Sequence, residues 1–315
     1  MQKALITGSS GQIGSELIEE LAKKLGQKNV VGLDLNPPAD LKYEFVKLDA
    51  TDLEGLKKVV EDYEINEIYH LVSLLSASGE KNPDLAWKVN MQSLKNVLDI
   101  AKEKKLKVFW PSSIAAFGPT TPKENTPQKT ILEPNTMYGV TKVAGELLCN
   151  YYYHKFGVDV RSVRFPGLIS WKTPPGGGTT DYAVAIFYDA IQKGHYQCFV
   201  SKQTTLPMMY MSDALRAIIQ IMEAPAEKIK IRTSYNLAAI SFTAEQLAQE
   251  LKKYIDFTID YVPDYRQKIA DSWPKSIDDS AARADWGWKH KFGLEEMTKD
   301  MFENLLRKLG KQKKE

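Results

Sequence analysis

Near the start of the chain stands the run Lys3-Ala4-Leu5-Ile6-Thr7-Gly8-Ser9-Ser10-Gly11-Gln12-Ile13-Gly14. Its apolar segment at residues 4–6 predicts a buried β-strand, and apolar residues with helical spacing follow at residues 13–25. Between them, Gly8 permits a tight turn out of the strand, and Gly14 lets the helix pack closely against it. A strand, a glycine-rich turn and a helix in this order predict the first unit of a parallel α/β sheet.

The same alternation continues through the first half of the chain. Short apolar runs that predict buried strands lie at residues 4–6, 30–35, 45–48, 68–72, 108–110 and 160–165. Stretches with helical spacing lie between them, at residues 13–25, 53–63, 85–104 and 138–156. The pattern predicts a doubly wound parallel sheet of the Rossmann type, which binds ligands at the carboxyl ends of its strands.

The alternation weakens after residue 165. Residues 174–178 read Pro-Pro-Gly-Gly-Gly and predict a loop, and helical spacing returns at residues 182–191, 215–222, 244–254 and 295–309. Thr243 and Gln246 are spaced as a capping box for the third of these helices. We therefore expect a dinucleotide-binding domain over residues 1–165 and a smaller, interleaved substrate-binding lobe over residues 166–315.

The glycine-rich turn is suited to a dinucleotide. Gly11 lets the backbone approach a pyrophosphate, while Gly8 and Gly14 bring the strand and the helix together around it. Gln12 and Ile13 begin the helix, and the N-terminal end of a helix offers free N–H groups and a positive dipole end to phosphates. Because this triplet lies between a predicted strand and a predicted helix, it has the context that the dinucleotide motif requires.

Acidic residues follow the second and third predicted strands. Asp34 ends the second strand, where its carboxylate can accept hydrogen bonds from the adenosine ribose. The same charge repels a 2′-phosphate, and the next residues, Leu35 and Asn36, are not basic, so the pattern favours NAD over NADP. Asp49, after the third strand, could reach the adenine amino group or, as easily, cap the helix that begins near Leu53.

Three side chains after the fifth predicted strand suit hydride transfer. Ser113 ends that strand, and Tyr138 and Lys142 stand four residues apart in the next helix, so they share one face. A free tyrosine has a pKa near 10, and we expect a lysine ammonium about 4 Å away to lower it by roughly 2–3 units. The serine then orients a substrate hydroxyl, and the phenolate takes its proton while hydride leaves to the nicotinamide.

Two points about these residues stay open. The Tyr–Lys spacing also occurs at Tyr43 and Tyr151, but only Tyr138 follows a serine pair at the end of a strand. Either Ser112 or Ser113 could carry the catalytic hydroxyl, and the spacing to the following Phe-Gly pair at residues 117–118 favours Ser113.

The composition restricts the classes of function. The 315 residues carry a net charge of +2, which gives no electrostatic reason to expect nucleic acid or an anionic membrane as a partner. No apolar stretch approaches the roughly 18 residues of a membrane span, and the first strand leaves no room for a signal peptide, so we expect a cytoplasmic protein. Cys149, Cys198 and the four histidines lack metal-ligand spacing, so we expect reduced thiols and no metal site.

The glycine triplet, Asp34, Ser113 and the Tyr138–Lys142 pair together resemble the extended short-chain dehydrogenase/reductase superfamily over nearly the whole chain. Three further stretches look like those of the short-chain type of L-threonine 3-dehydrogenases: Arg-Phe-Pro-Gly-Leu-Ile-Ser at 164–170, Gly-Thr-Thr-Asp-Tyr-Ala at 178–183, and Asp-Ser-Trp-Pro-Lys-Ser-Ile-Asp-Asp at 271–279. Trp171 departs from the tyrosine more often found there. The resemblance implies oxidation of L-threonine to 2-amino-3-oxobutyrate with NAD, usually in a homodimer.

The resemblance also implies roles for individual residues. It assigns cofactor contacts to Leu71, Asn90 and Pro166, and substrate contacts to Ser76, Thr179, Thr180 and Trp273. We hypothesise that Asp181 binds the substrate ammonium or fixes the threonine pair. In the alternative interpretation, Thr179–Asp181 is simply the N-terminal cap of the next helix.

Two other functions stay open as alternatives. The nucleotide-sugar 4-epimerases and dehydratases of this superfamily use an arginine and an asparagine to bind the sugar nucleotide. The corresponding stretches here, Leu-Pro-Met-Met-Tyr-Met-Ser-Asp at 206–213 and Phe-Pro-Gly at 165–167, have neither, so a diphosphate would lose a charge-assisted contact. A sensor that binds NAD without turnover would not need Ser113, Tyr138 and Lys142.

Overall fold

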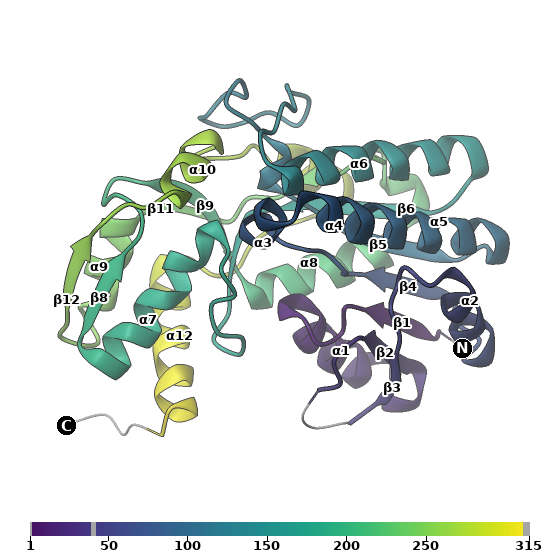
Figure 1. The fold of residues 1–315 in the computed structure, drawn as a ribbon, viewed down its shortest axis with the longest axis horizontal. Coiled ribbons are helices and arrows are strands. Elements are labelled where there is room, and N and C mark those ends of the chain that lie inside the picture. The colour runs from purple at the N-terminus through teal and green to yellow at the C-terminus, as the bar shows by residue number, and fades with distance from the viewer. Residues whose placement is uncertain (1, 39–41, 311–315) are drawn as a thin grey trace.

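The structure is a computed structural model that describes residues 2–38 and 42–310. In Figure 1, a large sheet with its flanking helices forms one half of the molecule, and a smaller lobe of helices and short strands forms the other. Among the described residues, no helix has both the length and the apolar character needed to cross a membrane.

A seven-stranded parallel sheet forms the centre of the larger half. Its strands are β1 (Ala4–Thr7), β2 (Val30–Asp34), β3 (Glu44–Lys47), β4 (Glu67–His70), β5 (Lys107–Ser113), β6 (Val160–Phe165) and β10 (Tyr235–Asn236). They lie in the order β10-β6-β5-β4-β1-β2-β3, and all neighbouring pairs are parallel. The chain runs from β1 toward one edge and then from β4 toward the other, so the loops after these two strands diverge and leave a crevice. The predicted doubly wound sheet is confirmed.

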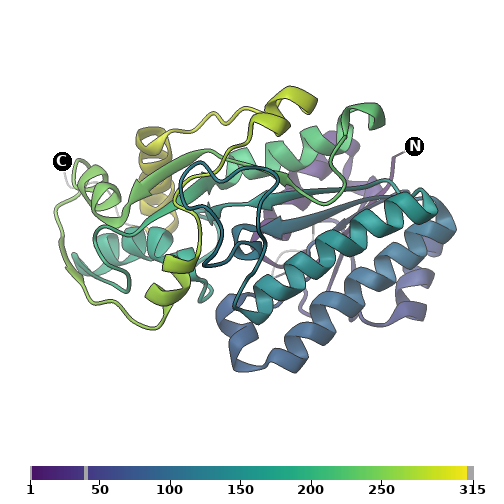
Figure 2. The ribbon, with the colours of Figure 1, turned by 90° about the horizontal axis from the view of Figure 1, so that it is seen from above.

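Helices cover both faces of this sheet. On one face lie α2 (Leu53–Asp62), α5 (Ser93–Lys104) and α6 (Met137–Phe156). On the other lie α1 (Gln12–Leu25), α8 (Met211–Glu223) and α11 (Ser280–Trp286). Neighbouring strand residues point to opposite faces of the sheet. Leu5 therefore packs in the core on the side of α2, α5 and α6, and Ile6 in the core on the side of α1, α8 and α11. Figure 2 shows α5 and α6 running side by side along their face.

The second half of the chain contributes to both halves of the molecule. α8 and β10 return to the large sheet. The smaller lobe contains a three-stranded sheet of β7 (Gly167–Ile169), β9 (Thr205–Tyr210) and β11 (Ile240–Thr243), and a parallel pair of β8 (His195–Cys198) and β12 (Thr258–Tyr261). Its helices are α7 (Tyr182–Lys193), α9 (Ala244–Leu251), α10 (Arg266–Ser272) and α12 (Leu294–Lys308). The boundary after residue 165 stays a prediction.

Three details differ from the expected elements. The helix predicted at residues 85–104 is divided into α4 (Pro83–Trp87), a π-helical turn (Lys88–Gln92) and α5. A short helix, α3 (Ser76–Lys81), precedes it and was not predicted. α9 ends at Leu251, earlier than expected, although its capping box between Thr243 and Gln246 is confirmed.

Candidate active site

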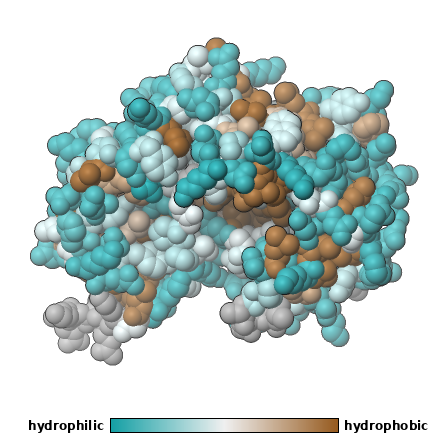
Figure 3. Space-filling view, viewed as in Figure 1, coloured by the Kyte–Doolittle hydropathy of each residue, from teal (hydrophilic) through white to brown (hydrophobic). Residues whose placement is uncertain are grey.

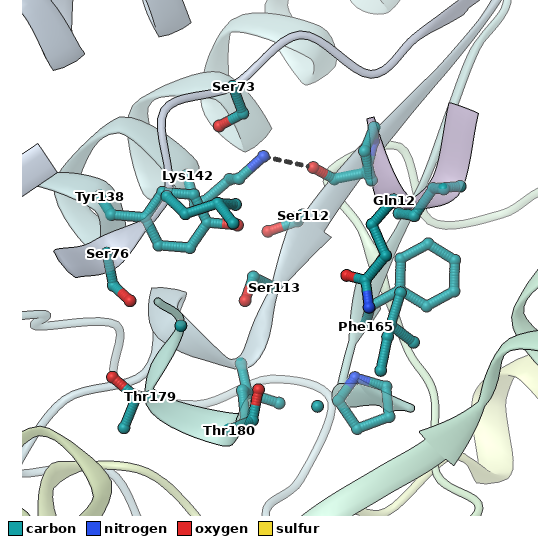
Figure 4. Close-up of a pocket in the computed structure, with 18 of the residues that line it drawn as sticks. Gln12, Ser73, Ser76, Ser112, Ser113, Tyr138, Lys142, Phe165, Thr179 and Thr180 are labelled. Atoms are coloured by element: carbon teal, nitrogen blue, oxygen red, sulfur yellow. Dashed lines mark hydrogen bonds between the residues drawn. The ribbon is translucent and has the colours of Figure 1, made fainter. Parts of the chain in front are cut away.

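A pocket lies at the carboxyl ends of the parallel strands, between the sheet and the smaller lobe. Figure 3 shows the surface hollowed between the two halves, with hydrophobic residues lining the hollow. Six predicted cofactor contacts line the pocket: Gln12, Ile13, Leu71, Tyr138, Lys142 and Pro166. Six predicted substrate contacts line it as well: Ser76, Ser113, Thr179, Thr180, Asp181 and Trp273. Residues from eight different elements or loops are thus brought to one place, as Figure 4 shows for ten of the lining side chains.

The glycine-rich turn has the backbone geometry that was expected of it. Gly8 adopts a φ of +75°, which side chains disfavour, and a Cβ on Gly14 would lie 2.1 Å from the Gly8 carbonyl oxygen. α1 begins after Gly11, and no side chain caps its first N–H groups. These donors therefore stay available to a phosphate, so the turn fits the pyrophosphate of a dinucleotide.

The two acidic residues have different surroundings. Asp34 ends β2, and its carboxylate accepts hydrogen bonds from the backbone N–H groups of Ser10 (3.1 Å) and Asn36 (3.2 Å), so it is fixed beside the glycine-rich turn. Asp49 accepts from the Thr51 N–H at 2.8 Å. The alternative that Asp49 caps α2 is wrong, because Asp52 is the residue whose side chain accepts from the Gly55 N–H.

Neither Leu35 nor Asp49 lines the pocket. Leu35 is exposed just beyond Asp34, at the carboxyl end of β2. Their assignment to the adenosine end of the cofactor stays a prediction.

Close packing places the catalytic helix against the end of β5. A Cβ on Gly139 would lie 2.3 Å from the Ala115 carbonyl oxygen, so only glycine allows α6 to begin this near to the strand end. Thr136 caps the helix by accepting from the Gly139 N–H at 3.1 Å. Tyr138 and Lys142 consequently face the pocket together with Ser113, and the Lys142 Nζ donates to the Pro111 carbonyl oxygen at 2.7 Å (Figure 4).

The expected pKa of the tyrosine was wrong for this arrangement. Burial raises the pKa of Tyr138 to about 12, and its hydrogen bond with Ser113 opposes that shift only in part. Burial also lowers the pKa of Lys142 to about 7. The Lys142 Nζ lies 5.3 Å from the centre of the Tyr138 ring and has no resolved effect on the tyrosine pKa. The desolvation of both groups thus outweighs the attraction that we expected between them.

The two serines have different environments. The Ser112 hydroxyl donates to Glu146 at 2.5 Å, whereas Ser113 is the hydrogen-bond partner of Tyr138. Glu146 is buried in α6 and also forms a double hydrogen bond with Arg164 of β6, at 2.8 and 2.6 Å. Sequence reasoning missed this buried ion pair, because Glu146 and Arg164 carry no local signal of their pairing.

Asn90 lies in the π-helical turn behind the pocket. Its side-chain amide accepts from the Leu74 N–H (2.7 Å) and donates to the Leu74 carbonyl oxygen (3.2 Å) and to Thr141 (3.1 Å). Asn90 is buried and does not line the pocket. It therefore joins the loop after β4 to the catalytic helix. This loop contributes Leu71, Ser73 and Leu75 to the pocket wall. A direct contact of Asn90 with the cofactor stays a prediction.

The smaller lobe contributes the wall opposite Tyr138. The Thr179 hydroxyl is buried and has no hydrogen-bond partner in the described structure, so it is a donor without an assigned role. Asp181 accepts from the backbone N–H groups of Gly177 (2.7 Å) and Gly178 (2.8 Å), and the latter is the N-terminal capping contact of the turn Thr179–Asp181. Asp181 thus caps the turn Thr179–Asp181 itself, whereas its side chain makes no capping hydrogen bond with α7, the next helix. A contact of Asp181 with the substrate stays a prediction.

The pocket is rich in hydroxyl groups and poor in positive charge. Within the described residues, Lys142 is the only cationic side chain that lines it. The stretch in which epimerases were expected to carry an arginine forms most of β9 and the start of α8. Met208 is buried in the core of the smaller lobe, and Met209 in the core between the large sheet and α1, α8 and α11. Ser73 and Leu75 also line the pocket, although they were not predicted.

Comparisons with known proteins agree with this geometry. A family model described as "NAD dependent epimerase/dehydratase family" matches residues 4–238. An uncharacterised epimerase/dehydratase of Staphylococcus aureus (strain USA300) is 51% identical over 314 residues, with 98% of each protein covered.

Two solved structures are similar over almost their whole length. A GalE-like L-threonine dehydrogenase from Cupriavidus necator, in its holo form, is 56% identical, with 96% of this chain and 99% of that chain covered and a TM-score of 0.95. A monomeric L-threonine 3-dehydrogenase from a metagenome, in its apo form, is 49% identical, with the same coverage and the same TM-score. The chain belongs to the NAD-dependent epimerase/dehydratase family, a branch of the extended short-chain dehydrogenases/reductases.

Proposed function

We propose that this protein oxidises the 3-hydroxyl of L-threonine with NAD, yielding 2-amino-3-oxobutyrate. The observation that carries the proposal is a small pocket in which Ser113 lies beside Tyr138, Thr179 and Thr180 lie on the opposite wall, and Lys142 is the one described cation. Such a lining suits a small zwitterion with a hydroxyl group and provides no clamp for a diphosphate. The likeness to L-threonine dehydrogenases supports the same substrate.

The residues of this chain have separate parts in the reaction. The glycine-rich turn and Asp34 would hold NAD, which would accept the hydride from C3 of the substrate. Ser113 orients the 3-hydroxyl, and Tyr138 Oη receives the proton of that hydroxyl. Because burial holds Tyr138 protonated near neutral pH, the phenol must lose its own proton first. Burial lowers the pKa of Lys142 to about 7, and in its charged form the ammonium group favours this loss, because a positive charge stabilises the phenolate.

The other polar groups bind and orient the substrate. The Thr179 hydroxyl, buried without a partner, and Ser76 are positioned for the substrate carboxylate, which accepts hydrogen bonds from hydroxyl groups. Asp181 fixes the turn that carries Thr179 and Thr180 through its two backbone contacts.

A turnover assay tests the proposal. Purified protein with NAD is offered L-threonine, D-threonine and 3-hydroxybutyrate, and NADH is followed at about 340 nm. A nucleotide sugar is offered as well, and its conversion is followed by chromatography of the product, because an epimerase returns the hydride and releases no NADH. We expect NADH from L-threonine only, and its loss in Tyr138→Phe with NAD binding retained. NADH from 3-hydroxybutyrate but not from L-threonine would move the protein to another hydroxyl substrate. NAD binding without turnover of any compound would favour the sensor.

We also propose that two copies of the chain pair through the outer face of α6. Val140, Leu147 and Tyr151 recur there at spacings that place them on one side of the helix, and all three are exposed, Leu147 by 59%. Trp87 of the neighbouring α4 is 47% exposed beside them. A second copy would cover this apolar face with its own. Light scattering should give twice the mass of the chain, and Leu147→Glu should give the mass of one chain.

A further inference from the structure

The long connection between β5 and α6 lies against the segment that follows α10. Thr126 and Ile277 form a parallel bridge, in which the Thr126 N–H donates to the Ser276 carbonyl oxygen and the Asp278 N–H donates to the Thr126 carbonyl oxygen, both at 3.0 Å. The two segments are far apart in the sequence, and the second of them contains Trp273, a wall of the pocket.

Lys123 makes four hydrogen bonds at this contact. Its Nζ donates to the carbonyl oxygen of Ser272 at 2.5 Å and to that of Gly118 at 3.2 Å. Its own carbonyl oxygen accepts from the N–H groups of Lys275 (2.8 Å) and Ser276 (3.3 Å). One residue thus holds the turn 272–276 from both ends, while Trp273 lies between the points of attachment.

The ammonium group is an unusual choice for this position. It is partly buried, and burial lowers the pKa of Lys123 while Asp271 raises it. Within residues 2–38 and 42–310, both of its hydrogen bonds go to backbone carbonyls and no carboxylate forms an ion pair with it. The Ser272 carbonyl is the last of α10, and a helix leaves its final carbonyls without partners inside the helix. A cationic cap satisfies that carbonyl.

The clamped turn touches the substrate side of the pocket in two ways. Trp273, the first residue after α10, is 6% exposed and lines the pocket. α10 itself packs against the turn Thr179–Asp181, which carries the threonine hydroxyls. A shift of the end of α10 would therefore move Trp273 and the turn Thr179–Asp181 together. The glycine-rich turn would stay in place.

We propose that Lys123 is a positioning residue for substrate binding, which fixes Trp273 and the end of α10 at the wall of the pocket. This inference rests on the proposed function for its kinetic test. Lys123 touches neither the substrate site nor the glycine-rich turn, so it acts through Trp273. A cap that served only the stability of the fold would leave the affinity for substrate unchanged in the folded protein.

Three variants of the full chain test this role. Lys123→Met keeps the length of the side chain but removes the donors, and Lys123→Arg restores donors that can reach two carbonyl oxygens. Lys275→Met is the control on the same segment, because among the described residues the Lys275 side chain has one polar contact, an exposed ion pair with Glu124, 3.5 Å away. We expect Lys123→Met to raise the KM for L-threonine about tenfold with a smaller change in kcat and an unchanged Kd for NAD. We expect Lys123→Arg to return the KM to within about threefold of the wild-type value.

Hydrogen exchange gives a second readout that needs no substrate. Mass spectrometry of peptides that cover residues 270–278 should show backbone exchange at least about tenfold faster in Lys123→Met than in the wild type, and close to wild-type exchange in Lys275→Met. A wild-type KM in folded Lys123→Met, or an equal rise in Lys275→Met, overturns the positioning role. Unchanged exchange at 270–278 overturns the clamp itself. If the wild-type protein forms no NADH from L-threonine, the proposed function fails, and the exchange measurement still decides the clamp.

Discussion

Replacement of His70 by asparagine should flatten the dependence of stability on pH below neutrality. His70 ends β4 and is fully buried, with Nδ1 2.7 Å from the Thr7 hydroxyl and Nε2 3.1 Å from the Ser93 hydroxyl. A neutral imidazole has one donor and one acceptor nitrogen, so two hydroxyl groups satisfy it without a charge. Burial, with a smaller effect from the charge of Lys142, lowers the pKa of His70 to about 3.

The magnitude follows from the difference between the folded and the unfolded pKa. In the unfolded chain the imidazole takes up a proton near pH 6.5, whereas in the folded protein it stays neutral until about pH 3. Between these values the unfolded state binds the additional proton, so stability falls as the pH falls. At pH 5 the pH is about 1.5 units below the pKa of the unfolded chain, which at about 1.36 kcal/mol per unit corresponds to about 2 kcal/mol of stability.

Urea unfolding at pH 8, 7, 6 and 5 measures this contribution. Between pH 8 and pH 5 the free energy of unfolding should fall by about 2 kcal/mol more in the wild type than in His70→Asn. This difference does not depend on how much stability the variant loses at pH 8 through altered packing. His154→Asn, which replaces an exposed histidine, is the matched control and should follow the wild-type curve. Parallel curves for the wild type and His70→Asn would show that His70 is not held neutral by its surroundings, and would refute the reasoning.

Three further predictions concern the site. Because burial holds Tyr138 protonated at pH 7, the kcat/KM for NADH formation should rise between pH 7 and pH 9, and a flat profile would contradict this. Ser113→Ala should lower kcat/KM about 10²-fold or more with little loss of stability, whereas Ser112→Ala should mainly lower the free energy of unfolding by about 1–2 kcal/mol, since Glu146 loses a buried partner. Equal kinetic losses in the two would argue against the assignment. Gly14→Ala should weaken NAD binding at least about tenfold, because its Cβ would lie 2.1 Å from the Gly8 carbonyl oxygen. Calorimetry measures the affinity, and Gly176→Ala is the control, because a Cβ at Gly176 meets no atom within 4 Å.

The parts of the fold that the sequence predicts well have local causes. The turn at Gly8 and Gly14 is determined by residues within one strand–helix unit, and the parallel strands of the large sheet are short apolar runs separated by helices. The carboxyl ends of parallel strands meet at one edge, so the sequence also predicts that Ser113 and the Tyr138–Lys142 pair belong to one site. The π-helical turn around Asn90 is not visible in the pattern, because helical spacing continues through it.

The parts that the sequence does not predict depend on distant partners. Glu146 pairs with Arg164 of the next strand, and Lys123 caps a helix that begins at Arg266. The pKa values of Tyr138 and Lys142 depend on burial, which the pair spacing does not reveal, so the expected attraction between them was overestimated. In the smaller lobe, β8 and β12 pair with each other although helices and other strands lie between them in the chain. Period and composition carry little information about such pairings.

Isotope transfer tests the central claim most directly. L-threonine that carries deuterium at C3 is incubated with the protein and NAD, and the nicotinamide product is analysed by mass spectrometry. We predict that the reduced cofactor gains one deuterium, that the initial rate falls when chemistry limits turnover, and that Tyr138→Phe forms no labelled product. Reduced cofactor without deuterium, or no reduced cofactor while NAD remains bound, would contradict the transfer of hydride from C3 of L-threonine in this pocket.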